Sequence, residues 1–92
     1  MKISHITPTR IYNEGILKAV FSITIDDCIT ITDIKVIQKD TEITVSMPRR
    51  RNEDGVFKEI VYASNPEAKE KIKKTVLEAY NTYMMLCRSF EA

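Results

Sequence analysis

Apolar and polar residues alternate along much of the first two thirds of the chain, which is the pattern of half-buried β-strands. The alternation is strongest over residues 16–26. The apolar positions of this run share one face: Leu17, Ala19, Phe21, Ile23 and Ile25. A first strand is predicted over residues 2–12, and because Pro8 within it cannot donate to a ladder, we expect it at an edge or beside a bulge. Asn13-Glu14-Gly15 lies between the two runs and predicts a hairpin turn.

The alternation changes phase once, in the run that follows a turn at Asp26-Asp27. Residues 28–38 carry one apolar pair, Ile29 and Ile31, and then a second pair in the opposite phase, Ile34 and Val36. A flat strand cannot place both pairs on one face. We therefore expect a bulge or a sharp bend at Thr32-Asp33.

The hydrophobic period changes to that of a helix in the last third of the chain. Asn65-Pro66 supplies a capping residue and a first-turn proline, and Glu67 suits the positive end of the helix dipole, so we expect a helix over residues 66–88. Its broad apolar stripe is expected to face the sheet: Ile72, Val76, Ala79, Tyr80, Tyr83, Leu86 and Cys87. Leu77 and Met84 lie off this stripe, where they could belong to a dimer contact or to a ragged edge of the core.

Two further strands are predicted at residues 43–47 and 56–62. The fold class is therefore α+β: an antiparallel sheet of about five strands, rich in hairpins, over residues 2–62, with one face covered by one long C-terminal helix at about 66–88. The 92 residues predict a single domain, 1–92. A chain of this length buries a modest core, so pairing with a second copy would help it.

The start of the chain, Met1-Lys2-Ile3, leads into a strand pattern without the apolar region of a signal peptide, and no apolar run has the length of a membrane span. We therefore expect a cytoplasmic protein that makes no membrane contact. In that reducing compartment, Cys28 and Cys87 are expected to be small buried hydrophobes rather than a disulfide.

Candidate catalytic chemistry is scarce. The one histidine, His5, lies in the first predicted strand with no base–nucleophile partners in the pattern. The paired carboxylates Asp26-Asp27 are expected to cap a turn, because a cation site needs several more oxygen donors at fixed spacing. With neither zinc spacing nor a glycine-rich phosphate loop, we expect no enzyme activity, metal, cofactor or small-molecule substrate.

Three consecutive arginines, Arg49, Arg50 and Arg51, lie between two strand patterns, so we expect them on a connecting loop. Guanidinium groups grip phosphate oxygens bidentately, which favours a nucleic-acid contact. The formal net charge is only +1, so any such contact must be a local patch. Because Glu53 and Asp54 follow at once, a solubilising turn with balanced charges is an alternative of equal weight on these residues alone.

A second basic stretch lies at residues 69–74 of the predicted helix. Helical geometry puts Lys71 and Lys74 on the polar face together with Glu70 and Glu78. A charge-balanced solvated face is therefore favoured over direct contact with nucleic acid, although both remain open.

The order and spacing of several segments resemble the SpoVG family, the stage V sporulation protein G or septation protein family, over residues 1 to about 83. The segments that carry the resemblance are Asp26-Asp27 through Asp33-Ile34-Lys35-Val36-Ile37, Met47-Pro48-Arg49-Arg50-Arg51, Asp54-Gly55-Val56-Phe57-Lys58-Glu59-Ile60 and Glu78-Ala79-Tyr80. Tyr62-Ala63 departs from the His-Pro pair that is frequent in the family.

This resemblance implies a small cytosolic bacterial protein that forms homodimers, binds DNA and in some cases RNA, and is linked to sporulation, septation and gene regulation. Arg50 and Arg51 match the family's basic positions after Met-Pro, whereas Arg49 replaces a small polar residue. Lys58 matches a further basic position.

We therefore expect a homodimeric nucleic-acid-binding regulator whose phosphate contacts come from the three arginines, with secondary contacts from Lys58, Lys71 and Lys74. The alternative is a protein-interaction module in septation or cell division that does not touch nucleic acid, in which an exposed sheet edge docks a partner strand.

Overall fold

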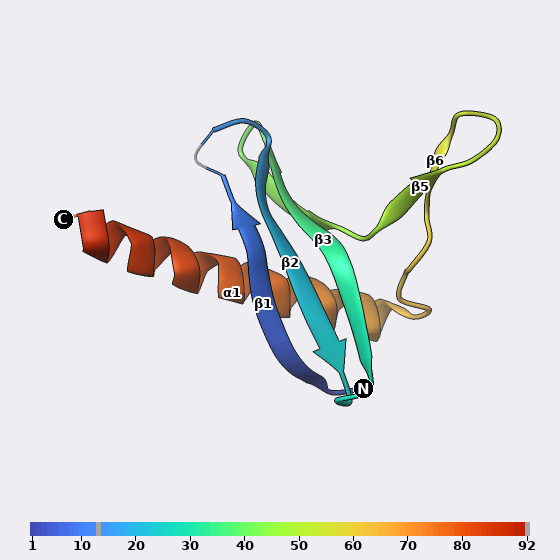
Figure 1. The fold of residues 1–92 in the computed structure, drawn as a ribbon, viewed down its shortest axis with the longest axis horizontal. Coiled ribbons are helices and arrows are strands. Elements are labelled where there is room, and N and C mark those ends of the chain that lie inside the picture. The colour runs from blue at the N-terminus through green and yellow to red at the C-terminus, as the bar shows by residue number, and fades with distance from the viewer. Residues whose placement is uncertain (13, 92) are drawn as a thin grey trace.

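The computed structural model describes residues 1–12 and 14–91, and side chains as far as Leu86. Its elements are β1 (Ile3–Ile11), β2 (Leu17–Ile25), β3 (Ile29–Lys39), β4 (Glu42–Ser46), β5 (Arg49–Arg51), β6 (Phe57–Glu59) and α1 (Pro66–Glu91). Over this range the expected α+β class is confirmed: a four-stranded antiparallel sheet, a two-stranded sheet and a C-terminal helix (Figure 1).

The main sheet has the order β1-β2-β3-β4, so each strand pairs with its neighbour in sequence. Pro8 lies in the edge strand β1, next to a register irregularity between Pro8 and Arg10, as its missing N–H group predicts. The turn before β2 contains Gly15, whose φ of 88° is the left-handed conformation that glycine adopts without strain.

The predicted bulge at Thr32-Asp33 is confirmed. Phe21 pairs with Ile34 and Ile23 pairs with Ile31, so a single residue of β2 lies opposite two residues of β3. Asp33 has a φ of 58°. This local irregularity moves the second apolar pair of β3 onto the same face as the first.

The core lies between one face of the main sheet and α1, which crosses that face diagonally (Figure 1). Its buried residues come from β2, β3 and the helix: Ala19, Phe21, Ile23, Ile34, Val36, Ile72, Val76 and Tyr80. Tyr83 also packs inward, with its ring centroid 6.3 Å from that of Phe21. Leu77 and Met84 pack against this core and so form its ragged edge.

Two expectations about apolar side chains differ from the structure. Leu86 is 50% exposed, because it lies beyond the part of α1 that the sheet covers. Cys28 is also exposed, because it follows Asp26 and Asp27 in the tight β2–β3 turn. Its thiol is free. The side chain of Cys87 lies outside the described residues.

The helix starts where the sequence predicts. The Asn65 side-chain oxygen accepts a hydrogen bond of 2.8 Å from the backbone N–H of Ala68, so Asn65 is the N-cap and Pro66 is the first helical residue. The helix extends to Glu91, three residues past the expected end at residue 88. Within the described residues, no helix combines the length and apolar character needed to cross a membrane.

The expected fifth strand does not join the main sheet. Residues 57–59 pair instead with residues 49–51, which form a strand rather than the expected loop. We call residues 49–59 the arm. Figure 1 shows the arm projecting away from both the main sheet and the helix. It leaves β4 through the buried Pro48, whose carbonyl accepts a 2.9 Å hydrogen bond from the Ile60 N–H at the arm's base.

Candidate nucleic-acid interface

The strand register of the arm divides its basic residues between two faces. Arg50 lies opposite Lys58, while Arg49 lies opposite Glu59 and Arg51 opposite Phe57. Residues that are directly opposite in an antiparallel pair share a face, and successive residues of one strand alternate. By register, Arg50 therefore shares a face with Lys58, and Arg49 and Arg51 lie on the reverse face.

A hydrogen-bonded turn holds this register. The Asn52 side-chain oxygen accepts hydrogen bonds of 3.0 Å from the N–H groups of both Asp54 and Val56. The Asn52 N–H donates to the Val56 carbonyl at 2.9 Å, and the Gly55 N–H donates to the Asn52 carbonyl at 3.0 Å. Gly55 has a φ of 80°, and the Arg51 guanidinium lies over it, since a Cβ at Gly55 would be 3.2 Å from Arg51 Nη2.

The charges of the arm balance along the sequence, but most of its cations are not in ion pairs. Arg49 forms the arm's ion pair, with Glu59, at 3.9 Å between Nη2 and Oε1. Neither Arg50, Arg51 nor Lys58 has an ion-pair partner among the described residues. A shallow hollow on the arm is lined by Arg50, Arg51, Asn52, Glu53, Lys58 and Ile60. Placing like charges opposite one another in a ladder is unfavourable, so the Arg50–Lys58 pair has a cost that a bound anion would relieve.

The helix lysines do not extend the face that Arg50 and Lys58 form. Lys71 Nζ donates to the backbone carbonyl of Met1, which ties it to the start of the chain. Lys74 is exposed on the same polar face of α1. The sequence interpretation named these two lysines, and the structure places neither beside the arm's hollow.

Two other helix lysines, Lys69 and Lys73, lie closer to the arm. With Glu59 and an apolar floor they line a pocket of about 230 Å³ at the arm's base, whose remaining residues are Val45, Met47, Tyr62, Ala63 and Ile72. Sequence reasoning missed this pocket. The sequence feature that could have indicated it is the spacing of Lys69 and Lys73. They are four residues apart at the border of the apolar stripe, so they lie on the same side of the helix, next to the face that packs on the sheet.

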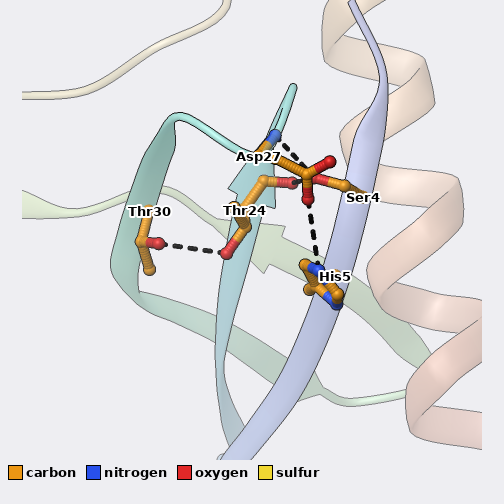
Figure 2. A network of polar contacts seen from close by, with 5 residues as sticks. All are labelled: Ser4, His5, Thr24, Asp27 and Thr30. Carbon is orange, nitrogen blue, oxygen red and sulfur yellow. Dashed lines mark hydrogen bonds and ion pairs between the residues drawn. The ribbon is translucent and has the colours of Figure 1, made fainter.

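Figure 2 shows polar contacts that tie the start of β1 to the β2–β3 turn. His5 Nε2 lies 3.2 Å from Asp27 Oδ1, with both side chains about 70% exposed. The Ser4 hydroxyl accepts a 2.9 Å hydrogen bond from the Asp27 N–H and donates to the Thr24 carbonyl at 3.2 Å. The serine hydroxyl is thus bonded to backbone rather than to the histidine, so these residues do not form a nucleophile–base pair.

In the part of the chain that the structure describes, no group of three or more His, Cys, Asp or Glu side chains is placed to hold a metal ion.

Comparison of the sequence with known proteins identifies its family. The family model described as SpoVG matches residues 1–82. A relative from Anaeromyxobacter sp. (strain Fw109-5) is 41% identical over 78 residues, covering 83% of this chain and 80% of the relative. A second, from Lachnospira eligens, is 40% identical over 80 residues, covering 87% and 91%. A third, from Caldicellulosiruptor bescii, is 35% identical over 80 residues, with the same coverage. All three carry the name "Putative septation protein SpoVG".

A family model that matches nearly the whole chain, together with these identities, confirms the resemblance found in the sequence. The chain belongs to the SpoVG family.

Proposed function

We propose that the protein is a homodimeric, cytoplasmic, non-enzymatic regulator that binds nucleic acid, and that its biological context is septation, as the names of its curated relatives indicate. The observation that carries the proposal is the opposition of Arg50 and Lys58 on a projecting arm, with no ion-pair partner for either within the described residues. Two unpaired cations on one face form a local basic patch in a chain whose net charge is +1.

The contact is with phosphate. Directly opposed residues have Cβ atoms about 5 Å apart, so the two side chains converge on one phosphate or on two neighbouring ones. The Arg50 guanidinium supplies a bidentate fork and the Lys58 ammonium a point charge. Phosphate contacts position a protein on nucleic acid, whereas sequence is read from base edges. Arg51 borders the same hollow, with its guanidinium over Gly55, and supplies a further cation beside this contact.

Homodimer formation is supported by the apolar surface around the arm. Four large apolar side chains at its tip and base are more than half exposed: Val56, Phe57, Ile60 and Tyr62. Several exposed apolar side chains within one short segment, residues 56–62, are typical of an association surface. A two-fold pair displays two arms, which would address two half-sites or two stretches of one backbone.

The experiment measures binding of labelled DNA and RNA by fluorescence anisotropy at two salt concentrations. The Arg50→Ala/Lys58→Ala variant is expected to weaken binding and to reduce the salt slope by about 1–2. Arg49→Ala/Glu59→Ala is the matched control, because it removes an ion pair from the reverse face without changing the net charge, and it should leave the slope nearly unchanged. Equal slopes for wild type and the Arg50/Lys58 variant would contradict the assignment.

The dimer is tested separately by light scattering at micromolar concentration. Wild type is expected at twice the monomer mass. Phe57→Ser combined with Ile60→Ser should shift the mass toward the monomer, because both side chains are about 60% exposed in the single chain. A wild-type protein that is wholly monomeric would contradict the dimer.

A protein-interaction module is the second candidate, and a specific observation favours it. β4 is one of the two outer strands of the main sheet, and among the described residues no strand pairs with its free edge. Such an edge accepts an extended segment of a partner by strand addition. Partners captured on the immobilised protein that survive nuclease treatment would support this candidate over nucleic-acid binding.

A further inference from the structure

The main sheet has a second face that no described element covers. The helix packs on the face formed by Phe21, Ile23 and Val36, and Figure 1 shows it on one side of the sheet, behind β1, β2 and β3, with no element over their near side. The arm projects beyond the sheet rather than folding over it. Side chains on this open face are therefore available to a partner.

One cross-strand row of the open face carries two cations. Arg10 of β1 pairs with Val20 of β2, Val20 pairs with Lys35 of β3, and Lys35 pairs with Ser46 of β4. Residues in register share a face, so these four side chains form a line across the whole sheet. We call them the transverse row.

Val20 supports this arrangement. It lies on the uncovered face, yet only 8% of it is exposed. The neighbours that the register places on its two sides are Arg10 and Lys35, both with long aliphatic stems. Such stems lie along apolar surface and leave the charged group in water. The two cationic heads are thus presented outward, flanking a small apolar centre.

Charge and polarity on this face favour an anionic partner. Lys18 adds a third cation, two positions before Val20 in β2. Two acids share the face by register: Asp33 in the β3 bulge, which forms no ion pair with Lys35 or with another described residue, and Glu42, which lies opposite Lys39 at the far end of β3. Hydroxyl groups fill neighbouring positions of this face: Thr7, Ser22, Thr24, Thr30 and Ser46.

The transverse row also leads to the arm. Its last member, Ser46, is three residues before Arg49, where the arm begins. Four strands span three inter-strand spacings, about 14 Å, which is roughly four nucleotides at 3.4 Å each. A backbone that lies along the row therefore reaches the base of the arm.

We propose that the open face is a second nucleic-acid contact, in which Arg10 and Lys35 bind phosphates of the same strand that the arm holds. The proposal rests on the proposed function, because it extends that binding site from the arm across the sheet. The row contains no aromatic side chain to stack on a base, so its contacts are to the backbone and are independent of sequence.

The experiment uses the full chain and labelled random-sequence DNA and RNA, single-stranded and duplex, about 20 nucleotides long so that the oligonucleotide exceeds one binding site. The Arg10→Gln/Lys35→Gln variant removes both charges but keeps most of the stems over Val20. It is expected to weaken binding about 3- to 10-fold and to lower the salt slope by about 1–2. Lys39→Gln, at the β3–β4 end of the same face, is the control and should have little effect, because Glu42 lies directly opposite Lys39.

A second variant on the same face is expected to have the opposite effect, tighter binding. Asp33→Asn removes the acid, and asparagine tolerates the left-handed backbone at this position, where φ is 58°. It should tighten binding by about 2- to 3-fold and steepen the salt slope. Thermal unfolding of each variant separates a loss of contact from a loss of fold.

The outcomes separate the two proposals. If the arm variant Arg50→Ala/Lys58→Ala weakens binding while the Arg10/Lys35 and Asp33 variants match wild type, the open face is not a contact and the proposed function stands. If wild type shows no salt-dependent binding, or if no variant changes it, the proposed function itself is overturned and the second contact with it.

Discussion

Replacing Lys58 by glutamate should strengthen the arm and weaken nucleic-acid binding at the same time. Lys58 lies opposite Arg50 in the β5–β6 ladder, so the substitution turns a repulsive cross-strand pair into an attractive one. The same change removes one of the two cations that we assign to phosphate. The stability of the arm should therefore rise while the affinity for nucleic acid falls. A purely structural role for Lys58 does not predict this combination.

The size of the effect on the arm follows from Coulomb's law. At a separation of roughly 6 Å in a water-like dielectric, two unit charges interact by about 0.7 kcal/mol, so reversing one sign changes the energy by about 1.4 kcal/mol. Both side chains are exposed, and screening at physiological salt reduces the gain to about 0.5–1 kcal/mol.

Amide hydrogen exchange reports the arm locally, whereas a melting curve is dominated by the core. The amides of Asn52 and Ile60 close the two ends of the arm by hydrogen bonds to Val56 and Pro48. In Lys58→Glu their exchange should slow by about 2- to 5-fold, the equivalent of 0.5–1 kcal/mol. Anisotropy should show binding at least about 10-fold weaker, with a salt slope that is shallower by 1–2.

Lys58→Gln is the matched control, because it removes the charge without creating a new pair and should fall between wild type and Lys58→Glu in both measurements. Unchanged binding by Lys58→Glu would refute the phosphate contact. Lost binding with faster exchange would show instead that the substitution disrupts the arm.

Three further substitutions test the fold around the site. Val76→Ala removes two fully buried methyl groups and should lower the free energy of unfolding by about 2 kcal/mol, measured by urea titration. Asn65→Ala removes the cap on the Ala68 N–H and should cost about 1 kcal/mol in the same assay, whereas Ser64→Ala, one residue earlier, should not. Gly55→Ala forces a left-handed alanine within 3.2 Å of Arg51 Nη2, so exchange in the arm should accelerate by roughly 5-fold while the urea midpoint stays the same; an equal shift of both would mean that the arm and the core unfold together.

The main sheet could be predicted from the sequence because its strands alternate and its turns carry recognisable residues. Even the bulge at Thr32-Asp33 was visible, since two apolar pairs in opposite phase leave no other way to share a face. The short strand Arg49–Arg51 was not, because three identical charged residues have no alternation to detect. Its conformation is set by pairing with residues 57–59.

The candidate site was predicted only in part, because strand pairing rather than local sequence brings its residues together. The sequence identified Arg50 and Lys58 separately, but which residue lies opposite which depends on the register that the Asn52–Gly55 turn imposes. The transverse row had no linear signature at all. Arg10 and Lys35 are 25 residues apart and meet through two successive strand pairings.

The separation of the arm from the core also bears on how such proteins diverge. None of the buried core residues lies between Arg49 and Glu59, and the arm joins the rest of the chain only at its base. Selection for folding therefore acts on one set of positions and selection for a target on another. A lineage can exchange the arm's side chains for new ones, and so acquire new targets, without first accumulating compensating changes in the sheet and the helix.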